Sequence, residues 1–278
     1  MSIRLFYERD IMKFNQTIIT LLCALPLLVG LTACGEKDNN TIKVGATAGP
    51  HAQVVEAVAE EAAKQGLNVE VVTFSDYITP NAALADGTID LNSYQHQPFL
   101  NNYNNNNEKQ LVSIGRSILM RMGIYSDKYL SLADLPEGAT ITIPNDPTNS
   151  GRGLLLLEDA GFIKLKPGLG DKATIYDVVE NPKKFKFIEM DAAQLPRTLS
   201  DAAASVITMN YVMSSGLDPK KQGLYFEAKD AELAVMVIAA READKDNATY
   251  KKFVEIYHSK PIQAFIDTTF KGTIEPAF

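Results

Sequence analysis

Apolar and polar side chains follow a regular order along the first half of the chain. Residues 41–46 (TIKVGA) and 68–74 (NVEVVTF) have the short apolar pattern, alternating in the second segment, that is typical of strands. Between them, residues 54–64 (VVEAVAEEAAK) place apolar side chains at helical spacing. A helix over residues 81–86 and a strand over residues 88–92 continue this order. The pattern predicts an α/β fold with a parallel sheet, whose ligand positions lie at the carboxyl ends of the strands.

The same order starts again near residue 122, after which a second α/β unit is predicted. Its glycine- and proline-rich residues 144–153 are expected to form a loop. The remaining strands are expected over residues 122–126, 140–143, 185–190, 204–207 and 232–241, and the remaining helices over residues 153–161, 192–199, 248–259 and 260–270. No sequence repeat relates the two halves. Two α/β units in series predict two lobes.

The N-terminal segment predicts export. Lys13 precedes an apolar run over residues 18–31 (IITLLCALPLLVGL), which is shorter than the roughly 20 residues that span a bilayer. Such a run fits the apolar region of a secretory signal. Small residues then lead into Cys34 in the sequence LTACG, which resembles a bacterial lipobox in which this cysteine is acylated. An ordinary signal or a buried apolar helix is the alternative.

The charges that precede this signal indicate where translation starts. Residues 1–11 mix acidic and basic side chains, which is unusual for a signal, and Met12 follows them. We therefore expect a start at Met12, a signal peptide that ends at residue 33, and a lipidated tether over residues 34–40. The other cysteine, Cys23, lies in the leader, so the mature chain is expected to have no disulfide and no thiol nucleophile.

Composition and motifs exclude several classes of function. The net charge is −7 and no basic run with interleaved aromatic residues occurs, which argues against nucleic-acid binding. The three histidines are dispersed and form no cluster with cysteine, so neither a metal nor another cofactor is expected. No GxSxG, HExxH, P-loop or GxGxxG motif is present, so the chain is not expected to be an enzyme.

Eight segments in order resemble the NlpA-type methionine-binding lipoproteins of bacterial ABC importers. Each is weak alone, but together they span nearly the whole mature chain from about Lys43. They are residues 47–51 (TAGPH), 74–77 (FSDY), 94–100 (YQHQPFL), 143–153 (IPNDPTNSGRG), 179–184 (VENPKK), 192–197 (AAQLPR), 210–211 (NY) and 271–272 (KG).

The resemblance implies a two-lobe periplasmic-binding-protein fold of type 2, with the ligand in the cleft between the lobes. Lobe 1 would comprise residues 41–121 and 232–278, and lobe 2 residues 122–231. The implied partners are a methionine-like amino acid, an ABC permease and ATPase, and a membrane reached through the N-terminal lipid. A monomer is expected, anchored to the cell membrane and facing outside the cytoplasm. Whether the inner or the outer membrane holds it is left open.

The resemblance also implies a ligand-binding set, which divides into two groups. Aromatic residues that match positions around the ligand side chain are Tyr77, Tyr94 and His96, and polar residues that match positions around its amino and carboxylate groups are Asn149, Arg152 and Asn210. The chemistry is suitable, because a guanidinium presents a planar fork to a carboxylate and carboxamides both donate and accept hydrogen bonds. Aromatic faces also favour a thioether sulfur. His51 is interpreted as a structural or pocket-rim residue.

The chain departs from the family pattern in the strand that returns to lobe 1. The family has an asparagine there, and this position is occupied by Met236, without the usual neighbouring proline and aromatic residue. Two interpretations follow. Either Glu232 compensates for the lost contact to the amino group, or the ligand is not ordinary methionine but a derivative or a methionine-containing dipeptide. A surface lipoprotein that has lost transport is a further alternative. Met120, Met122 and Met236 are otherwise interpreted as core packing.

Overall fold

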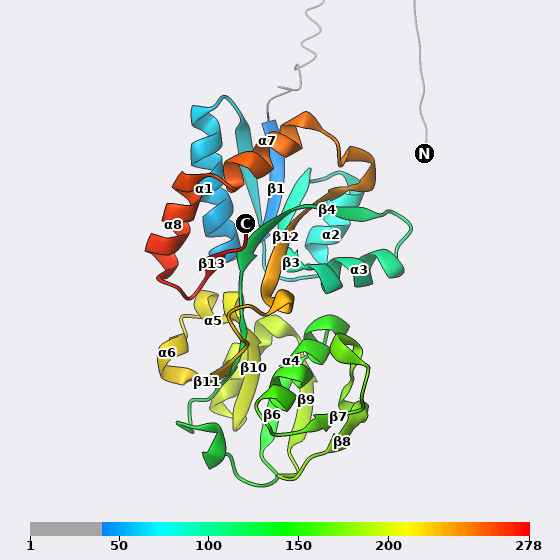
Figure 1. Cartoon of the computed structure of the whole chain (residues 1–278), viewed down its shortest axis with the longest axis vertical. Coiled ribbons are helices and arrows are strands. Elements are labelled where there is room, and N and C mark those ends of the chain that lie inside the picture. Colours follow the sequence, from blue (N-terminus) through cyan, green and yellow to red (C-terminus); the bar gives the residue numbers. More distant parts are fainter. Residues whose placement is uncertain (1–40) are drawn as a thin grey trace, which may run out of the picture. The chain divides into compact units, whose positions relative to one another are not determined.

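The computed structural model describes residues 41–278, and their strands form two large sheets (Figure 1). The larger sheet has six strands in the order β13-β4-β12-β3-β1-β2. The smaller has five in the order β11-β5-β10-β6-β9, and β7 and β8 form a separate pair. The predicted signal peptide, the start at Met12, the acylated Cys34 and the tether lie outside the described residues.

The first part of the chain builds most of the larger sheet, as the strand and helix pattern predicts. Its elements are β1 (Thr41–Thr47), α1 (Pro50–Lys64), β2 (Asn68–Phe74), α2 (Thr79–Asp86), β3 (Leu91–His96), α3 (Gln97–Asn105) and β4 (Leu111–Leu119). β1 pairs in parallel with both β2 and β3. The strand predicted over residues 88–92 is displaced to β3, and neither α3 nor β4 was predicted.

The second part forms the smaller sheet and the helices around it. Its elements are β5 (Met122–Tyr125), β6 (Thr140–Pro144), α4 (Pro147–Asp159), β7 (Lys164–Leu165), β8 (Val178–Glu180), β9 (Lys186–Met190), β10 (Ala204–Thr208), α5 (Met209–Ser214), α6 (Pro219–Gln222) and β11 (Gly223–Phe226). The helix predicted over residues 192–199 is present as a 3-10 helix, Ala192–Ser200, that contains Pro196. A proline in this position removes one backbone donor, which disfavours the α-helical pattern.

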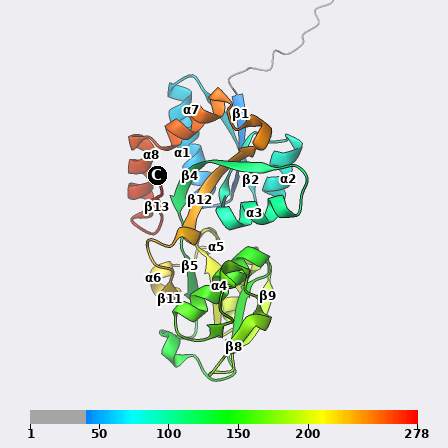
Figure 2. The ribbon, with the colours of Figure 1, turned by 45° about the vertical axis from the view of Figure 1, so that its right-hand side comes forward.

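The chain then returns to the larger sheet through β12 (Val235–Arg241), α7 (Ala248–Tyr257), α8 (Lys260–Phe270) and β13 (Glu275–Pro276). α1, α7 and α8 lie together on one face of this sheet, and α2 and α3 cover the other (Figure 2). Within residues 41–278, no helix combines the length and the apolar character needed to cross a bilayer.

The prediction of a loop over residues 144–153 was wrong, because α4 begins at Pro147. Asp146 caps this helix by accepting a hydrogen bond from the backbone N–H of Asn149, and a proline is favourable in the first turn. The glycines that suggested a loop serve packing: a Cβ on Gly151 would lie 2.0 Å from the backbone oxygen of Asp171. Asn149 and Arg152 therefore project from the first turns of a rigid helix.

Two chain segments connect the sheets, and they are hydrogen-bonded to each other. The first, Met120 and Arg121, joins β4 to β5, and the second, residues 227–234, joins β11 to β12. The N–H of Met120 donates to the carbonyl of Ala234 at 2.7 Å. The predicted lobe boundaries fall at these connections and are kept as a proposal. Two sheets joined by two crossing segments form the architecture expected of a two-lobe binding protein.

Candidate functional site

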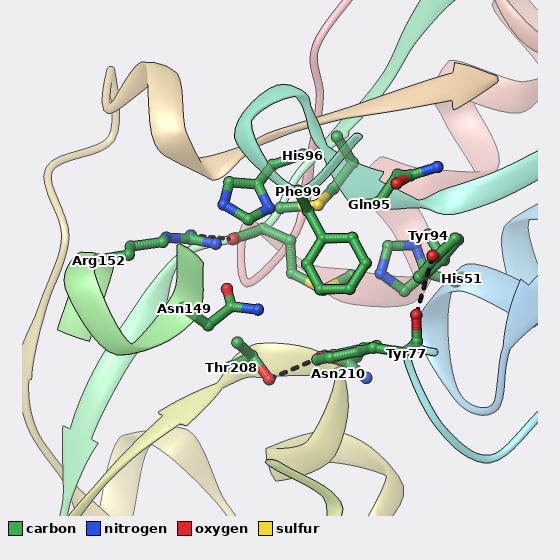
Figure 3. A pocket seen from close by; sticks show the side chains of 12 residues that line it. His51, Tyr77, Tyr94, Gln95, His96, Phe99, Asn149, Arg152, Thr208 and Asn210 are labelled. Carbon is green, nitrogen blue, oxygen red and sulfur yellow. Dashed lines mark hydrogen bonds between the residues drawn. The ribbon is translucent and has the colours of Figure 1, made fainter. Parts of the chain in front are cut away.

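A pocket lies between the two sheets, at the ends of their central strands. Figure 3 shows the side chains that line it. They come from α1, β3, α3, α4, β12 and β10 with α5, from the loop before α2, and from the first connection, and are His51, Tyr77, Tyr94, Gln95, His96, Phe99, Met120, Asn149, Arg152, Thr208, Asn210 and Met236. Open α/β sheets bind ligands at the carboxyl ends of their strands, because a crevice forms there at the point where the strand order reverses.

The larger sheet contributes an aromatic wall. The ring centroids of Tyr77 and Tyr94 lie 6.1 Å apart, and Phe99 lies 6.1 Å from the first ring and 6.0 Å from the second at steep angles. The Tyr94 hydroxyl donates to the backbone carbonyl of Tyr77 at 3.0 Å, which fixes the loop before α2 against β3. The sulfur-containing side chains of Met120 and Met236 also line the pocket and are 3% and 5% exposed. This wall suits an apolar side chain or a thioether.

Buried carboxamides hold this wall in place. The side chain of Asn81, in α2, donates to that of Gln95 at 2.8 Å and accepts from it at 2.7 Å. Asn92 donates to the same Asn81 oxygen at 2.9 Å. All three side chains are buried, so these hydrogen bonds tie α2 firmly to the strand that carries Tyr94 and His96.

The smaller sheet contributes polar groups through the first turns of α4. The Asn149 Nδ2 donates to both carboxylate oxygens of Asp146 at 3.1 Å, which leaves its Oδ1 as an acceptor. Arg152 is 2% exposed, and its Nε and Nη2 each lie 2.6 Å from an oxygen of Glu227. Nη2 also donates to the carbonyl of Met120 at 3.0 Å. No hydrogen bond among residues 41–278 uses Nη1, so one side of the guanidinium can receive another acceptor.

Direct hydrogen bonds join the two sides of the pocket. The Tyr77 hydroxyl lies 2.8 Å from the Thr208 Oγ1 and donates to the Asn210 Oδ1. The ring of Tyr77 also lies 4.9 Å from that of Tyr211, whose hydroxyl donates to the Ser75 carbonyl at 3.3 Å. Tyr77 thus contacts three side chains of the opposite lobe.

Several buried polar atoms of the pocket lack a hydrogen-bond partner within the described part of the chain. They are the Nδ2 of Asn210, the Nε2 of His96 and the Nδ1 of His51. A buried polar group without a partner costs about 1–3 kcal/mol, so three of them around one space indicate a place for a polar ligand. Burial lowers the pKa of His51 to about 3 and, with the nearby Arg152, lowers the pKa of His96 well below its usual value. Both imidazoles are therefore neutral at pH 7.

The structure brings the predicted site residues together. The six ligand-binding candidates, Tyr77, Tyr94, His96, Asn149, Arg152 and Asn210, all line the pocket, and so do the possible residue Met236 and the rim residue His51. Their roles toward a ligand stay predictions. Glu232 lies elsewhere: its side chain is 76% exposed and pairs with Arg116 at 3.2 Å. The idea that Glu232 replaces the family asparagine therefore finds no contact to support it.

Sequence reasoning missed Glu227, Phe99, Gln95 and Thr208. Phe99 and Gln95 belong to the segment YQHQPFL that carries the resemblance, so they could have been found there. Glu227 gives no such signal, because its partner Arg152 is 75 residues away. Among residues 41–278, no group of three or more His, Cys, Asp and Glu side chains is placed to hold a metal ion.

Comparison with known proteins identifies the family. A sequence model described as NlpA lipoprotein matches residues 42–278. The chain is 42% identical to a probable D-methionine-binding lipoprotein MetQ of Vibrio cholerae (94% of this chain, 98% of the relative). It is 43% identical to the D-methionine-binding lipoprotein MetQ of Escherichia coli K12, with the same coverage of each.

A solved structure agrees with these sequence comparisons. The nutrient binding protein from Burkholderia cenocepacia bound to methionine superposes with a TM-score of 0.82 at 45% identity, covering 85% of this chain and 100% of that one. The expected two-lobe periplasmic-binding fold is thereby confirmed. With a family match over nearly all the described residues and relatives above 40% identity, this chain is a member of the NlpA lipoprotein family.

Proposed function

We propose that this chain is the substrate-binding lipoprotein of an ABC importer and that it encloses methionine or a closely related amino acid between its lobes. The observation that carries this proposal is a pocket to which lobe 2 contributes the cation Arg152 and two carboxamides, opposite an aromatic and thioether wall from lobe 1. A relative named as a D-methionine-binding lipoprotein is 43% identical to this chain, and a solved nutrient binding protein bound to methionine shares its fold at 45% identity.

The polar atoms match the two charged ends of a free amino acid. A zwitterion removed from water needs both charges paired, since an unpaired buried charge costs several kcal/mol. The free Nη1 of Arg152 and the Nδ2 of Asn210 are donors for the carboxylate. The Asn149 Oδ1, oriented by Asp146, is an acceptor for the ammonium group.

The side chain of the ligand would then lie along the aromatic wall. Tyr94 and Phe99 present ring faces and edges, and sulfur–aromatic contacts contribute about 0.3–1.5 kcal/mol each. The neutral imidazole of His96 adds a polar contact without adding a charge. A thioether is the polarizable, weakly polar group that such a wall favours over a charged one.

A ligand that contacts both lobes stabilises the closed form of the protein. A ligand stabilises a closed form only through contacts that the open form lacks, and here those contacts come from α4 on one side and from β3 on the other. The two connections between the sheets would act as the hinge. A permease with its ATPase would recognise the closed form, while acylated Cys34 anchors a monomer to the membrane outside the cytoplasm. We propose no chemical reaction for the site.

A changed ligand is the second candidate, and Met236 favours it. This side chain lines the pocket at a position where the family pattern has an asparagine, so one polar contact is replaced by an apolar one. Such a loss costs about 1–3 kcal/mol for a ligand that needs the contact. A methionine derivative or a methionine-containing dipeptide, or a surface role without transport, would be consistent with it.

Identification of the bound molecule tests the proposal. The full-length chain is purified in detergent under mild conditions and denatured, and the released small molecules are analysed by mass spectrometry. We expect methionine or a close relative in about equimolar amount. After removal of this ligand, calorimetric titration with L- and D-methionine should show one site. Release of no amino acid, together with no binding of either enantiomer, would overturn the proposal.

A further inference from the structure

Arg152 and Glu227 form a buried ion pair beside the pocket. Both pairs of atoms, Nε with Oε1 and Nη2 with Oε2, lie at 2.6 Å, so the contact is bidentate. The two side chains are 2% and 9% exposed. A bidentate carboxylate fixes both the plane and the direction of a guanidinium, which a single hydrogen bond does not.

Glu227 also joins the two connections between the lobes. It follows β11 directly, at the start of the second connection. Its Oε2 accepts from the N–H of Met122 at 2.6 Å, and its own N–H donates to the carbonyl of Met122 at 3.1 Å. Arg121 donates to the backbone carbonyl of Glu227 at 3.3 Å. Arg152 adds its bond to Met120, so both connections meet at one ion pair beside the pocket.

We propose that Glu227 is a positioning residue that holds the guanidinium of Arg152 for the ligand and, by compensating its charge, restricts the site to net-neutral ligands. This inference rests on the proposed function and deepens it, because it names the ligand class as zwitterions. Glu227 does not line the pocket and acts only through Arg152. Because Nε and Nη2 of Arg152 bind Glu227, the ligand carboxylate would accept a hydrogen bond from the remaining Nη1, whose orientation is fixed.

The charges around the pocket support this selectivity. Arg152 and Glu227 cancel, and the neighbouring carboxylate of Asp146 is held by the backbone and side chain of Asn149. The two pocket histidines, His51 and His96, are neutral. A zwitterion brings no net charge to this set, whereas an anion would add a negative charge to a buried site that already has one in excess, which Coulomb repulsion in a low-dielectric site opposes.

Two ligands that share the same thioether distinguish a positioning role of Glu227 from a role in packing alone. Methionine is a zwitterion, and 4-(methylthio)butanoate lacks only the amino group and is an anion. Their dissociation constants are measured by calorimetry for the full-length chain in detergent and for three variants: Glu227→Gln, Glu227→Asp, and the matched control Glu232→Gln. Glu232 lies in the same connection, but its carboxylate is exposed.

We expect the unmodified chain to prefer methionine by at least about tenfold, since the anion leaves the Asn149 oxygen without its partner. Glu227→Gln should weaken methionine binding by roughly tenfold or more, because the guanidinium loses its fixed orientation. The same variant should bind the anion no worse than before, because the site then has no excess negative charge to repel it. The preference for methionine over the anion should thus decrease by about tenfold or disappear. Glu227→Asp keeps the charge and should keep the preference, and Glu232→Gln should behave like the unmodified chain.

An unfolding cycle tests the pair without any ligand. Thermal midpoints are compared for Glu227→Gln, Arg152→Met and the double variant. Because removal of one partner leaves a buried charge unpaired, the double variant should be more stable than the less stable single variant. Equal weakening of both ligands by Glu227→Gln, or additive destabilisation in the cycle, would overturn the inference. If the unmodified chain binds neither ligand, the proposed function is wrong, and the cycle alone decides whether Glu227 holds Arg152.

Discussion

The two sides of the pocket differ in the kinds of side chain that line them. The side formed by lobe 1 has aromatic rings, thioethers and two neutral imidazoles but contributes no charged side chain to the pocket lining. The side formed by lobe 2 has the cation Arg152 and the carboxamides of Asn149 and Asn210, with Asp146 and Glu227 behind them. Under the proposed function, one side would select the shape and polarizability of the ligand side chain, and the other would select the ligand's charge.

The two sides also differ in how they are held. The lobe 1 wall is fixed by neutral hydrogen bonds among Asn81, Asn92 and Gln95. In lobe 2, carboxylates fix two of the polar groups that line the pocket: Asp146 holds Asn149, and Glu227 holds Arg152. Hydrogen bonds to charged groups contribute about 1.5–3 kcal/mol, against about 0.5–1.5 kcal/mol for neutral ones. Substitutions in lobe 2 should therefore have the larger effects on binding.

Removal of the cation should have the largest effect. Arg152→Ala deletes the donor for the ligand carboxylate and leaves Glu227 buried without its partner. We expect methionine affinity to fall roughly 100-fold or more, and stability to fall by about 3–5 kcal/mol from the unpaired carboxylate. Calorimetric titration measures the first effect and thermal unfolding the second.

Arg121→Ala is a suitable control for this change. It removes a guanidinium of the first connection that does not line the pocket, that donates to the backbone carbonyl of Glu227 at 3.3 Å and that lies 5.5 Å from the ring centroid of Phe226. Its methionine affinity should stay within about threefold of the unmodified chain, since no ligand contact is lost. Tight binding by Arg152→Ala would contradict the assignment of charge recognition to lobe 2.

Loss of an aromatic ring from the opposite wall should have an intermediate effect. Tyr94→Leu keeps an apolar side chain at a position that is 3% exposed, but it removes the ring that packs near Tyr77 and Phe99. We expect methionine affinity to fall about tenfold, from lost ring packing and sulfur–aromatic contact. Tyr94→Phe keeps the ring, loses only the bond to the Tyr77 carbonyl, and should bind within a few-fold of the unmodified chain. Equal losses in the two variants would show that the hydroxyl, and not the ring, matters.

Loss of the hydrogen bonds between the lobes should have a smaller effect on methionine affinity. Tyr77→Phe removes the hydroxyl that bonds to Thr208 and Asn210 but keeps the ring. The closed form loses neutral hydrogen bonds, so methionine affinity should fall about 2- to 10-fold. Tyr225→Phe, which removes a hydroxyl that bonds to Asp159 within lobe 2, is the matched control and should bind as before. If both variants bind equally well, direct contact between the lobes does not contribute to closure.

The sequence predicted most strands of both lobes, but it did not predict the first turns of α4, which carry Asn149 and Arg152. The α/β order of lobe 1 followed from periodicity, because β1, α1 and β2 have clear apolar patterns. In lobe 2, the first turns of α4 were interpreted as a loop, since the reason for Gly151 is the close approach of Asp171. Local propensity contains no information about such a contact.

The candidate site could be predicted only in part. The pocket residues came from short motifs that the family resemblance supplied, and all six lie together. Glu227 could not be predicted, because a carboxylate that pairs with an arginine 75 residues away leaves no mark in spacing or periodicity. Glu232 was the more visible glutamate in the same connection, yet its side chain faces solvent. Burial and long-range pairing, which distinguish the two, are properties of the folded chain.

The smallest effect on binding and a clear effect on stability should come from pH. Burial lowers the pKa of His51 to about 3, below the value of about 6.5 in an unfolded chain. The unfolded state therefore binds the proton first, and the stability that the neutral imidazole contributes is complete above pH 6.5 and is lost as the pH falls from 6.5 toward 3. At pH 5 this loss is about 2 kcal/mol for one such histidine. Methionine affinity should change less than about twofold between pH 7.5 and 6, because neither lobe 1 imidazole gains a charge in the folded state.

Thermal unfolding and calorimetry over this pH range test both statements, with His51→Gln as the variant. Glutamine cannot titrate, so the thermal midpoint of His51→Gln should fall less steeply below pH 6.5 than that of the unmodified chain. His258→Gln is the comparison variant, because His258 lies directly after α7, is exposed and does not line the pocket. If affinity instead fell steeply with acid while stability did not, an imidazole of the lobe 1 wall would be gaining a proton in the folded protein. The neutral character that separates this wall from the charged side of the pocket would then be wrong.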